Sequence, residues 1–225
     1  DLGYSAEGYE LPALEIVEHV IKTDPGNFQL FVDRAETLSE RREARKQSLV
    51  ERVEKAREIT EETAEQYLVW CDYNAESAAL HEAIEKSVEV VGADSPEYKA
   101  EKAIDFSNGN IRVLVSKPSI YGFGMNWQNC HNVIFCGLSD SYEQFYQAVR
   151  RCWRYGQEHP VKVHVIVSEK ELNVLDNVKK KQRQMDEMQS KMVALMRNVT
   201  MAEIMHTVRI TETYEPKERM ELPAW

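Results

Sequence analysis

Tyr67-Leu-Val-Trp-Cys71 is a compact apolar run rich in residues that favour strands, and it opens the part of the chain that decides the fold. The residues that follow it, Asp72-Tyr73-Asn74, can cap a helix. The same alternation of apolar runs and helical patterns repeats further along the chain. We expect strands at residues 67–71, 88–91, 111–115, 132–136 and 161–167, and helices at residues 75–87, 96–106 and 142–153.

Apolar strands that alternate with helices of about 10–15 residues are typical of βαβ units packed around a buried parallel sheet. The pattern therefore predicts an α/β fold with a doubly wound parallel sheet over residues 67–168. The sequence predicts three regions: residues 1–66 with a helical extension, the core at 67–168, and a C-terminal helical extension with a tail at 169–225.

The two flanking regions carry long stretches without Gly or Pro. Between Phe31 and about Gln66, apolar residues recur at mostly helical spacing among dense charges, which predicts one long helix or two in line. Residues 169–198 have an apolar stripe, and the run Lys179-Lys-Lys181 makes their middle basic. These lysines are either a solvated face or part of a nucleic-acid track. Before residue 30 the pattern is irregular, with a short strand or helix within residues 14–21.

Composition limits the class of protein. The net charge of -10 argues against a generally basic nucleic-acid binder, so any such contact must be local. No run approaches the roughly 20 apolar residues that span a bilayer, and no signal peptide is visible, so we expect no membrane partner. The four cysteines lack the spacing of a zinc ribbon or a disulfide framework, so we expect no metal site.

The segment Gln147-Ala-Val-Arg-Arg-Cys-Trp-Arg-Tyr-Gly-Gln157 carries the most distinctive chemistry. On a helix, Gln147, Arg150 or Arg151, and Arg154 lie three or four residues apart, so they can share a face, and no acidic residue lies between Glu143 and Glu158. Such an arrangement suits a multiply charged anion, because a guanidinium binds phosphate oxygens bidentately. The alternative is a helix whose arginines pair with acidic neighbours elsewhere in the fold.

A second segment, Val115-Ser-Lys-Pro-Ser-Ile-Tyr-Gly-Phe-Gly-Met-Asn-Trp-Gln128, follows a predicted strand. It places Gly122 and Gly124 in a loop, where the backbone can approach a phosphate closely. A turn at the edge of a sheet would account for a single Gly-x-Gly equally well.

The order of the two segments resembles motifs five and six of the Swi/Snf-like ATPases in helicase superfamily two. Gln147, Ala148, Arg151, Arg154, Gly156 and Gln157 match motif six, and Gly122, Gly124 and Asn126 match motif five. The resemblance implies a RecA-like fold in which Arg151 and Arg154 reach the phosphates of ATP, with Arg154 as the arginine finger. It implies that Gln147 lines the same cleft as Gly122, Gly124 and Asn126.

The resemblance covers about residues 67–168 and departs from the family within motif five. The family's Thr and Lys fall on Pro118 and Ser119, which leaves Ser116, Lys117 and Ser119 as the candidates for contact with a nucleic-acid backbone. Residues 1–12 and the Leu38-Ser-Glu-Arg-Arg42 segment resemble the interlobe connection of phage and bacterial members. For this reason we expect a cytoplasmic protein of a bacterial or phage-infected cell.

The resemblance implies the C-terminal lobe of an ATP-dependent DNA helicase or translocase. ATP and Mg²⁺ would bind in the intact protein, on an N-terminal RecA-like lobe of the same polypeptide, because this sequence has no Gly-x-x-x-x-Gly-Lys-Ser/Thr motif. We expect double-stranded DNA as the nucleic acid and no catalysis by this chain alone. The alternative is a RecA-like adaptor that binds nucleic acid or protein without hydrolysis. A free-standing metabolic enzyme is disfavoured, because no nucleophile or acid–base pair lies near the glycines.

Overall fold

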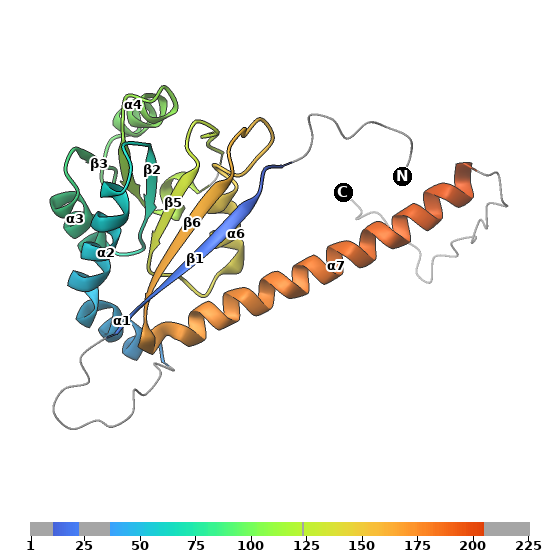
Figure 1. Cartoon of the computed structure of the whole chain (residues 1–225), viewed down its shortest axis with the longest axis horizontal. Coiled ribbons are helices and arrows are strands. Elements are labelled where there is room, and N and C mark those ends of the chain that lie inside the picture. Colours follow the sequence, from blue (N-terminus) through green and yellow to red (C-terminus); the bar gives the residue numbers. More distant parts are fainter. Residues whose placement is uncertain (1–10, 23–36, 123, 205–225) are drawn as a thin grey trace, which may run out of the picture. The chain divides into compact units, whose positions relative to one another are not determined.

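The fold is built on one six-stranded sheet in which every pairing is parallel. The computed structural model describes residues 11–22, 37–122 and 124–204 (Figure 1). The strand order is β1-β6-β5-β2-β4-β3. The strands are β1 (Leu14–Ile21), β2 (Tyr67–Trp70), β3 (Ser87–Glu89), β4 (Val113–Ser116), β5 (Asn132–Cys136) and β6 (Val161–Ser168). The predicted α/β fold with a parallel sheet is confirmed.

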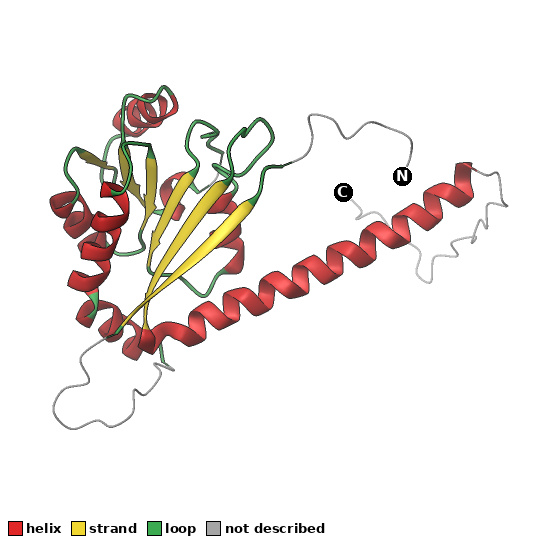
Figure 2. Ribbon diagram, viewed as in Figure 1, coloured by secondary structure: helices red, strands yellow, loops and turns green. Residues whose placement is uncertain are grey.

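Helices pack on both faces of this sheet (Figure 2). They are α1 (Leu38–Gln47), α2 (Leu49–Glu61), α3 (Asn74–Ala83), α4 (Pro96–Ser107), α5 (Pro118–Tyr121), α6 (Tyr142–Val149) and α7 (Leu172–Ile204), and a 3₁₀ turn at Glu169–Glu171 precedes α7. Within the described residues, no helix is long and apolar enough to cross a membrane.

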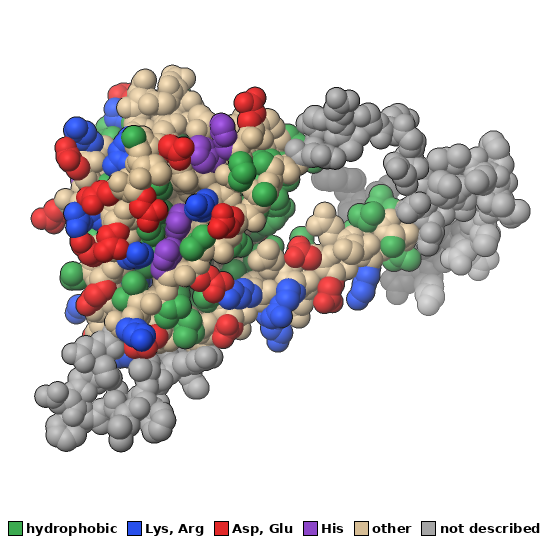
Figure 3. Space-filling model, in the orientation of Figure 1, with side chains coloured by type: hydrophobic (Ala, Val, Ile, Leu, Met, Phe, Trp, Pro, Cys, Tyr) green, Lys and Arg blue, Asp and Glu red, His purple; other side chains and the backbone are tan. Residues whose placement is uncertain are grey.

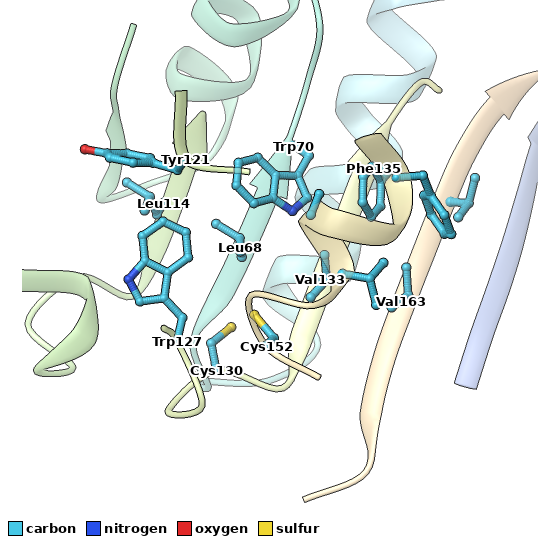
Figure 4. Close-up of a cluster of buried hydrophobic side chains, with 14 of the residues drawn as sticks. Leu68, Trp70, Leu114, Tyr121, Trp127, Cys130, Val133, Phe135, Cys152 and Val163 are labelled. Carbon is cyan, nitrogen blue, oxygen red and sulfur yellow. The ribbon is translucent and has the colours of Figure 1, made fainter. Parts of the chain in front are cut away.

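Alternation along the strands sends neighbouring side chains into two separate cores. On β2, Tyr67 and Val69 pack with α2 and α3, whereas Leu68 and Trp70 pack with α4, α6 and the first turns of α7. All four side chains are at most 2% exposed, as expected for a parallel sheet covered on both faces. Figure 4 shows part of the second core, with Trp70 and Phe135 close together.

The N-terminal region contributes a strand to this sheet. β1 pairs with β6 over its whole length, from Leu14 opposite Val161 to Ile21 opposite Ser168. The sequence left a strand and a helix open for this segment, and the structure shows the strand. The predicted division at residues 66 and 168 stays a prediction, and the sheet extends to residues before 67. Most of the proposed interlobe segment, at residues 1–10, lies outside the described residues.

Two predicted helices end earlier than expected. α3 ends at Ala83 instead of residue 87, and α6 ends at Val149 instead of Trp153. After Val149 the chain tightens into i→i+3 bonds, from the Arg151 and Cys152 amides to the Ala148 and Val149 carbonyls. Arg154 therefore lies beyond the end of this helix, and the prediction that it shares a helix face with Gln147 and with Arg150 or Arg151 is wrong.

The predicted long N-terminal helix is two consecutive helices, α1 and α2, joined at Ser48, and a buried charge network attaches them to the sheet. Glu76 at the start of α3 accepts hydrogen bonds from Arg45 Nε (3.0 Å) and Nη2 (3.1 Å) and from Arg52 Nη2 (2.9 Å). Its other contacts are the backbone amides of Asp72 and Tyr73, each at 3.1 Å. Removing one partner of such a buried pair costs about 3–5 kcal/mol, because an uncompensated charge remains.

This network lies where the carboxyl ends of the central strands meet. Arg45 also donates to Asp72 after β2, and Arg52 donates to the Cys136 carbonyl at the end of β5 (2.9 Å). The backbone at Gly137 has a φ of +96°, and a Cβ there would lie 2.0 Å from Arg45 Nη2. A glycine is therefore required for the arginine to reach the strand ends.

A pair of histidines joins the edge strand β1 to β6. His19 Nε2 and His164 Nδ1 are 3.0 Å apart, and the two rings stack with centroids separated by 5.3 Å. Burial, together with the charges of His19, Lys162 and Lys55, lowers the pKa of His164 to about 4. Burial and Lys55 also lower the pKa of His19, whereas Glu62 opposes that shift.

We expect the protein to lose stability as the pH falls from about 6.5 to about 4, because the unfolded histidines take up protons that the folded pair resists. At pH 4, the lowered pKa of His164 alone corresponds to a loss of about 2–3 kcal/mol in the free energy of unfolding. Urea unfolding of the wild type and of a His19→Gln/His164→Gln variant, at several pH values in this window, measures the effect. The variant should show a clearly smaller loss. Equal losses in the two proteins would contradict the assignment to this pair.

Candidate functional site

The two motif segments fold against each other. The first is the loop between β4 and β5, which contains α5 and the two glycines. The second is the end of α6 with the turn that follows it, residues 150–157. Trp127 anchors the loop: it is 0% exposed, makes edge-to-face contacts with Phe106 and Tyr121, and donates from Nε1 to the Ala103 carbonyl (3.3 Å) (Figure 4). The loop therefore has a fixed base in the core.

Arg151 connects the two segments. Its Nη1 donates to the Met125 carbonyl (3.0 Å), and its Nε donates to the Gln147 carbonyl (2.9 Å). The Gln147 side chain accepts a further bond from Nη2, and the Trp127 amide donates to the Arg151 carbonyl (2.9 Å). Burial lowers the pKa of Arg151, as do the charges of Arg154 and Arg150. In this arrangement the guanidinium is used to hold the loop.

Gln157 makes a second connection beside it. Its buried side-chain amide donates to the carbonyls of Gln128 (2.9 Å), Cys130 (3.0 Å) and Cys152 (3.3 Å). The Gln128 side chain donates in return to the Tyr155 carbonyl. Side-chain amides thus satisfy buried carbonyls that the secondary structure leaves unpaired. The two motifs form one hydrogen-bonded unit.

The side chain of Arg154 takes no part in this hydrogen-bonded unit. Arg154 is half-buried, and its side chain has no hydrogen bond or ion pair with any residue that the structure describes, whereas its backbone carbonyl accepts a bond from the Gln157 amide (3.1 Å). Arg150 differs, because its guanidinium lies over the rings of Tyr146 and Trp153. No ion pair with an acidic side chain forms at Arg150, Arg151 or Arg154 within the described part of the chain. The alternative of arginines paired with acidic neighbours is therefore not observed there.

The two glycines are constrained in different ways. A Cβ on Gly122 would lie 2.2 Å from the Pro118 carbonyl oxygen, so the turn after α5 excludes a side chain. Gly124 has a φ of +85°, a conformation that other residues rarely adopt. Asn126, two residues later, is exposed. These positions are compatible with a close approach of a ligand to the backbone.

The three nucleic-acid candidates differ in their accessibility. Ser116 is 0% exposed, and its hydroxyl donates to the Val90 carbonyl (2.9 Å), so it does not present a hydroxyl to a ligand in this structure. Lys117 is half-buried and donates to the side chain of Asn74, whereas Ser119 is exposed. Two residues of the three thus reach the surface at the carboxyl edge of the sheet.

The lysine run of α7 is partly used for attachment. Lys179 pairs with Glu18 of β1 (2.6 Å), and Lys181 donates to the Asp140 carbonyl (2.7 Å). On the face shown in Figure 3, acidic and basic side chains are interspersed. Arg45, Arg52 and Glu76 could not be recognised as a unit from the sequence, because Glu76 is 24 or more residues from both arginines. The only sequence signal was two arginines seven residues apart on one side of a predicted helix.

The comparisons with known proteins agree with this architecture. Residues 45–156 match the family model of the helicase conserved C-terminal domain. A comparison with curated protein sequences finds no match. Among solved structures, the chain is similar to the crystal structure of the C-terminal part of the Fun30 ATPase domain, with a TM-score of 0.52 and 17% sequence identity. The similarity covers 56% of this chain and 44% of that chain, so this chain spans less than half of that structure.

At 17% identity the structural similarity shows the fold alone, and that fold is RecA-like. The family model adds a similarity in sequence. The matched residues include the glycine loop, Arg151 and Arg154. The sequence match and the fold therefore agree over residues 45–156, which are similar to the helicase conserved C-terminal domain.

Proposed function

We propose that this chain is the C-terminal motor lobe of a Swi/Snf-like, ATP-dependent DNA helicase or translocase of the phage or bacterial type. Its Arg154 acts as the arginine finger on ATP held by an N-terminal lobe of the same polypeptide. The observation that carries the proposal is the contrast between two arginines three residues apart. The Arg151 guanidinium makes three internal hydrogen bonds, whereas the Arg154 side chain has no partner among the described residues.

The chemistry of this lobe is electrostatic. Bound ATP with Mg²⁺ supplies the phosphoryl group, and the N-terminal lobe holds both. Arg154 stabilises negative charge on the transferring group, which is the role of an arginine finger in phosphoryl transfer. Gln147, Gly122, Gly124 and Asn126 line the same cleft, and Arg151 positions them by holding the loop on α6.

Nucleic acid contacts a different part of the loop. Lys117 and Ser119 lie at its start, where β4 ends, and both are accessible. The contact is local, because the chain has a net charge of -10. Double-stranded DNA is the proposed substrate. ATP-driven closure of the two lobes would then move this contact along the backbone.

A second candidate is a RecA-like adaptor that binds without hydrolysis. It is favoured by the departures from motif five at Pro118 and Ser119 and by the inward hydroxyl of Ser116. The two candidates differ in whether Arg154 affects turnover.

In the polypeptide that carries both lobes, Arg154→Ala should lower the kcat of DNA-stimulated ATP hydrolysis by about 10³-fold or more, because an arginine finger contributes on this scale. Nucleotide affinity should change little. Steady-state ATPase assays and nucleotide titration measure the two quantities, with Arg150→Ala as the matched control. A kcat for Arg154→Ala within a few fold of the wild type would reject the finger and favour the adaptor.

Arg151→Gln should behave differently from Arg154→Gln in this chain. Losing the Arg151 guanidinium leaves the Met125 and Gln147 carbonyls without their donor, which costs about 1–3 kcal/mol. The free energy of unfolding should fall by that amount, and amide hydrogen exchange at residues 125–128 should become faster. Arg154→Gln should leave both measurements unchanged. Identical behaviour of the two variants would show that Arg151 does not hold the loop.

A further inference from the structure

A groove lies beside the carboxyl edge of the sheet, between the α1–α2 junction and the start of α3. Its volume is about 270 Å³. Leu49, Tyr73 and Ala75 give it an apolar floor, and the exposed side chains of Arg42 and Lys46 stand at its rim. Neither the motif loop nor the arginines after α6 contribute to it.

The charges around this groove are unbalanced. Arg45 and Glu76 also line it, but they bind each other within the buried network. The side chains of Arg42 and Lys46 have no hydrogen bond or ion pair with any described residue. They lie four residues apart on α1, so they project from the same side of the helix. The free charge at the groove is therefore positive, although the chain as a whole is acidic.

The floor suits a flat or ring-shaped apolar group. Tyr73 is 38% exposed, and the Arg45 guanidinium lies 4.8 Å from its ring centroid, which fixes the ring in place. Two cations beside an aromatic floor match the two parts of a nucleotide, its phosphate and its sugar or base. The volume is at the lower limit of small-molecule sites, about 300 Å³, so it fits one unit of a polymer.

The groove is also continuous with the proposed DNA contact. Asn74 follows Tyr73 in the chain and accepts a hydrogen bond from Lys117, the first residue of the motif loop. A strand that contacts Lys117 would therefore reach Tyr73 next.

We propose that this groove binds one nucleotide of the DNA strand that contacts the motif loop, with its phosphate between Arg42 and Lys46 and its sugar or base against Tyr73. The proposal rests on the proposed function, because it extends that DNA contact to the helical extension. It gives the extension a role in binding as well as in folding.

DNA binding by the full polypeptide tests this, measured as fluorescence anisotropy of a labelled oligonucleotide, single-stranded or duplex, over a range of salt concentrations. Arg42→Gln/Lys46→Gln should reduce the slope of log K against log salt by about 0.7–0.9 for each phosphate that the variant no longer binds. Lys55→Gln/Arg57→Gln on α2 is the matched control, because it removes two positive charges at partly exposed positions outside the groove and should leave the slope unchanged.

The aromatic floor is tested separately. Tyr73→Ala should weaken binding at least 5-fold at constant slope, because stacking on an aromatic ring contributes on this scale, and Tyr73→Phe should retain binding. A larger effect of Tyr73→Ala on the single strand than on the duplex would identify the base as the group on Tyr73, and equal effects would identify the sugar.

Three outcomes would overturn the proposal. The first is the same slope for the groove variant and its control. The second is wild-type affinity for Tyr73→Ala, in a protein whose thermal unfolding shows it to be folded. The third is displacement of the oligonucleotide by an acidic peptide of equal charge as effectively as by unlabelled DNA, which would indicate a protein partner.

Lys117→Gln separates this result from failure of the proposed function. If Lys117→Gln weakens DNA binding and the groove variants do not, only the proposal for the groove is rejected. If the wild-type polypeptide binds no DNA, the proposed function itself is rejected.

Discussion

The Glu76 carboxylate is the interaction on which the arrangement of this chain depends. It accepts hydrogen bonds from two arginines of the helical extension and from two backbone amides that follow β2. Burying these charges is favourable only because they compensate one another. The consequence is geometric. α1 and α2 are fixed at the carboxyl ends of the central strands, the part of an open parallel sheet where ligands usually bind.

The same principle separates the roles of the arginines after α6. Arg151 is buried and donates to two backbone carbonyls and to one side-chain amide oxygen, so it stabilises the contact between the two motif segments. Arg154 is left without such partners in the described part of the chain. A cation that the fold does not use internally is available to a ligand, and it is already positioned by the turn that Arg151 and Gln157 hold.

The sequence predicted the sheet well, because buried parallel strands are apolar runs that local composition reveals. The strands at Tyr67, Asn132 and Val161 begin where they were expected. The end of α6 was not predictable, because the turn that follows it is bonded to a distant segment: the Trp127 amide donates to the Arg151 carbonyl, 24 residues further along the chain. For the same reason the inward hydroxyl of Ser116 and the Glu76 network escaped prediction. The two motif segments were located from sequence, but the roles of their residues remain predictions.

The central claim is that Arg154 faces the transferring phosphoryl group of ATP on another lobe. The most direct measurement is a crystal or cryo-EM structure of the two-lobe polypeptide with DNA, Mg²⁺ and ADP–aluminium fluoride, an analogue of the transition state. We expect an Arg154 guanidinium nitrogen within hydrogen-bond distance of the fluoride, about 2.7–3.2 Å. A closed cleft in which Arg154 points to solvent, and another cation contacts the fluoride, would contradict this account.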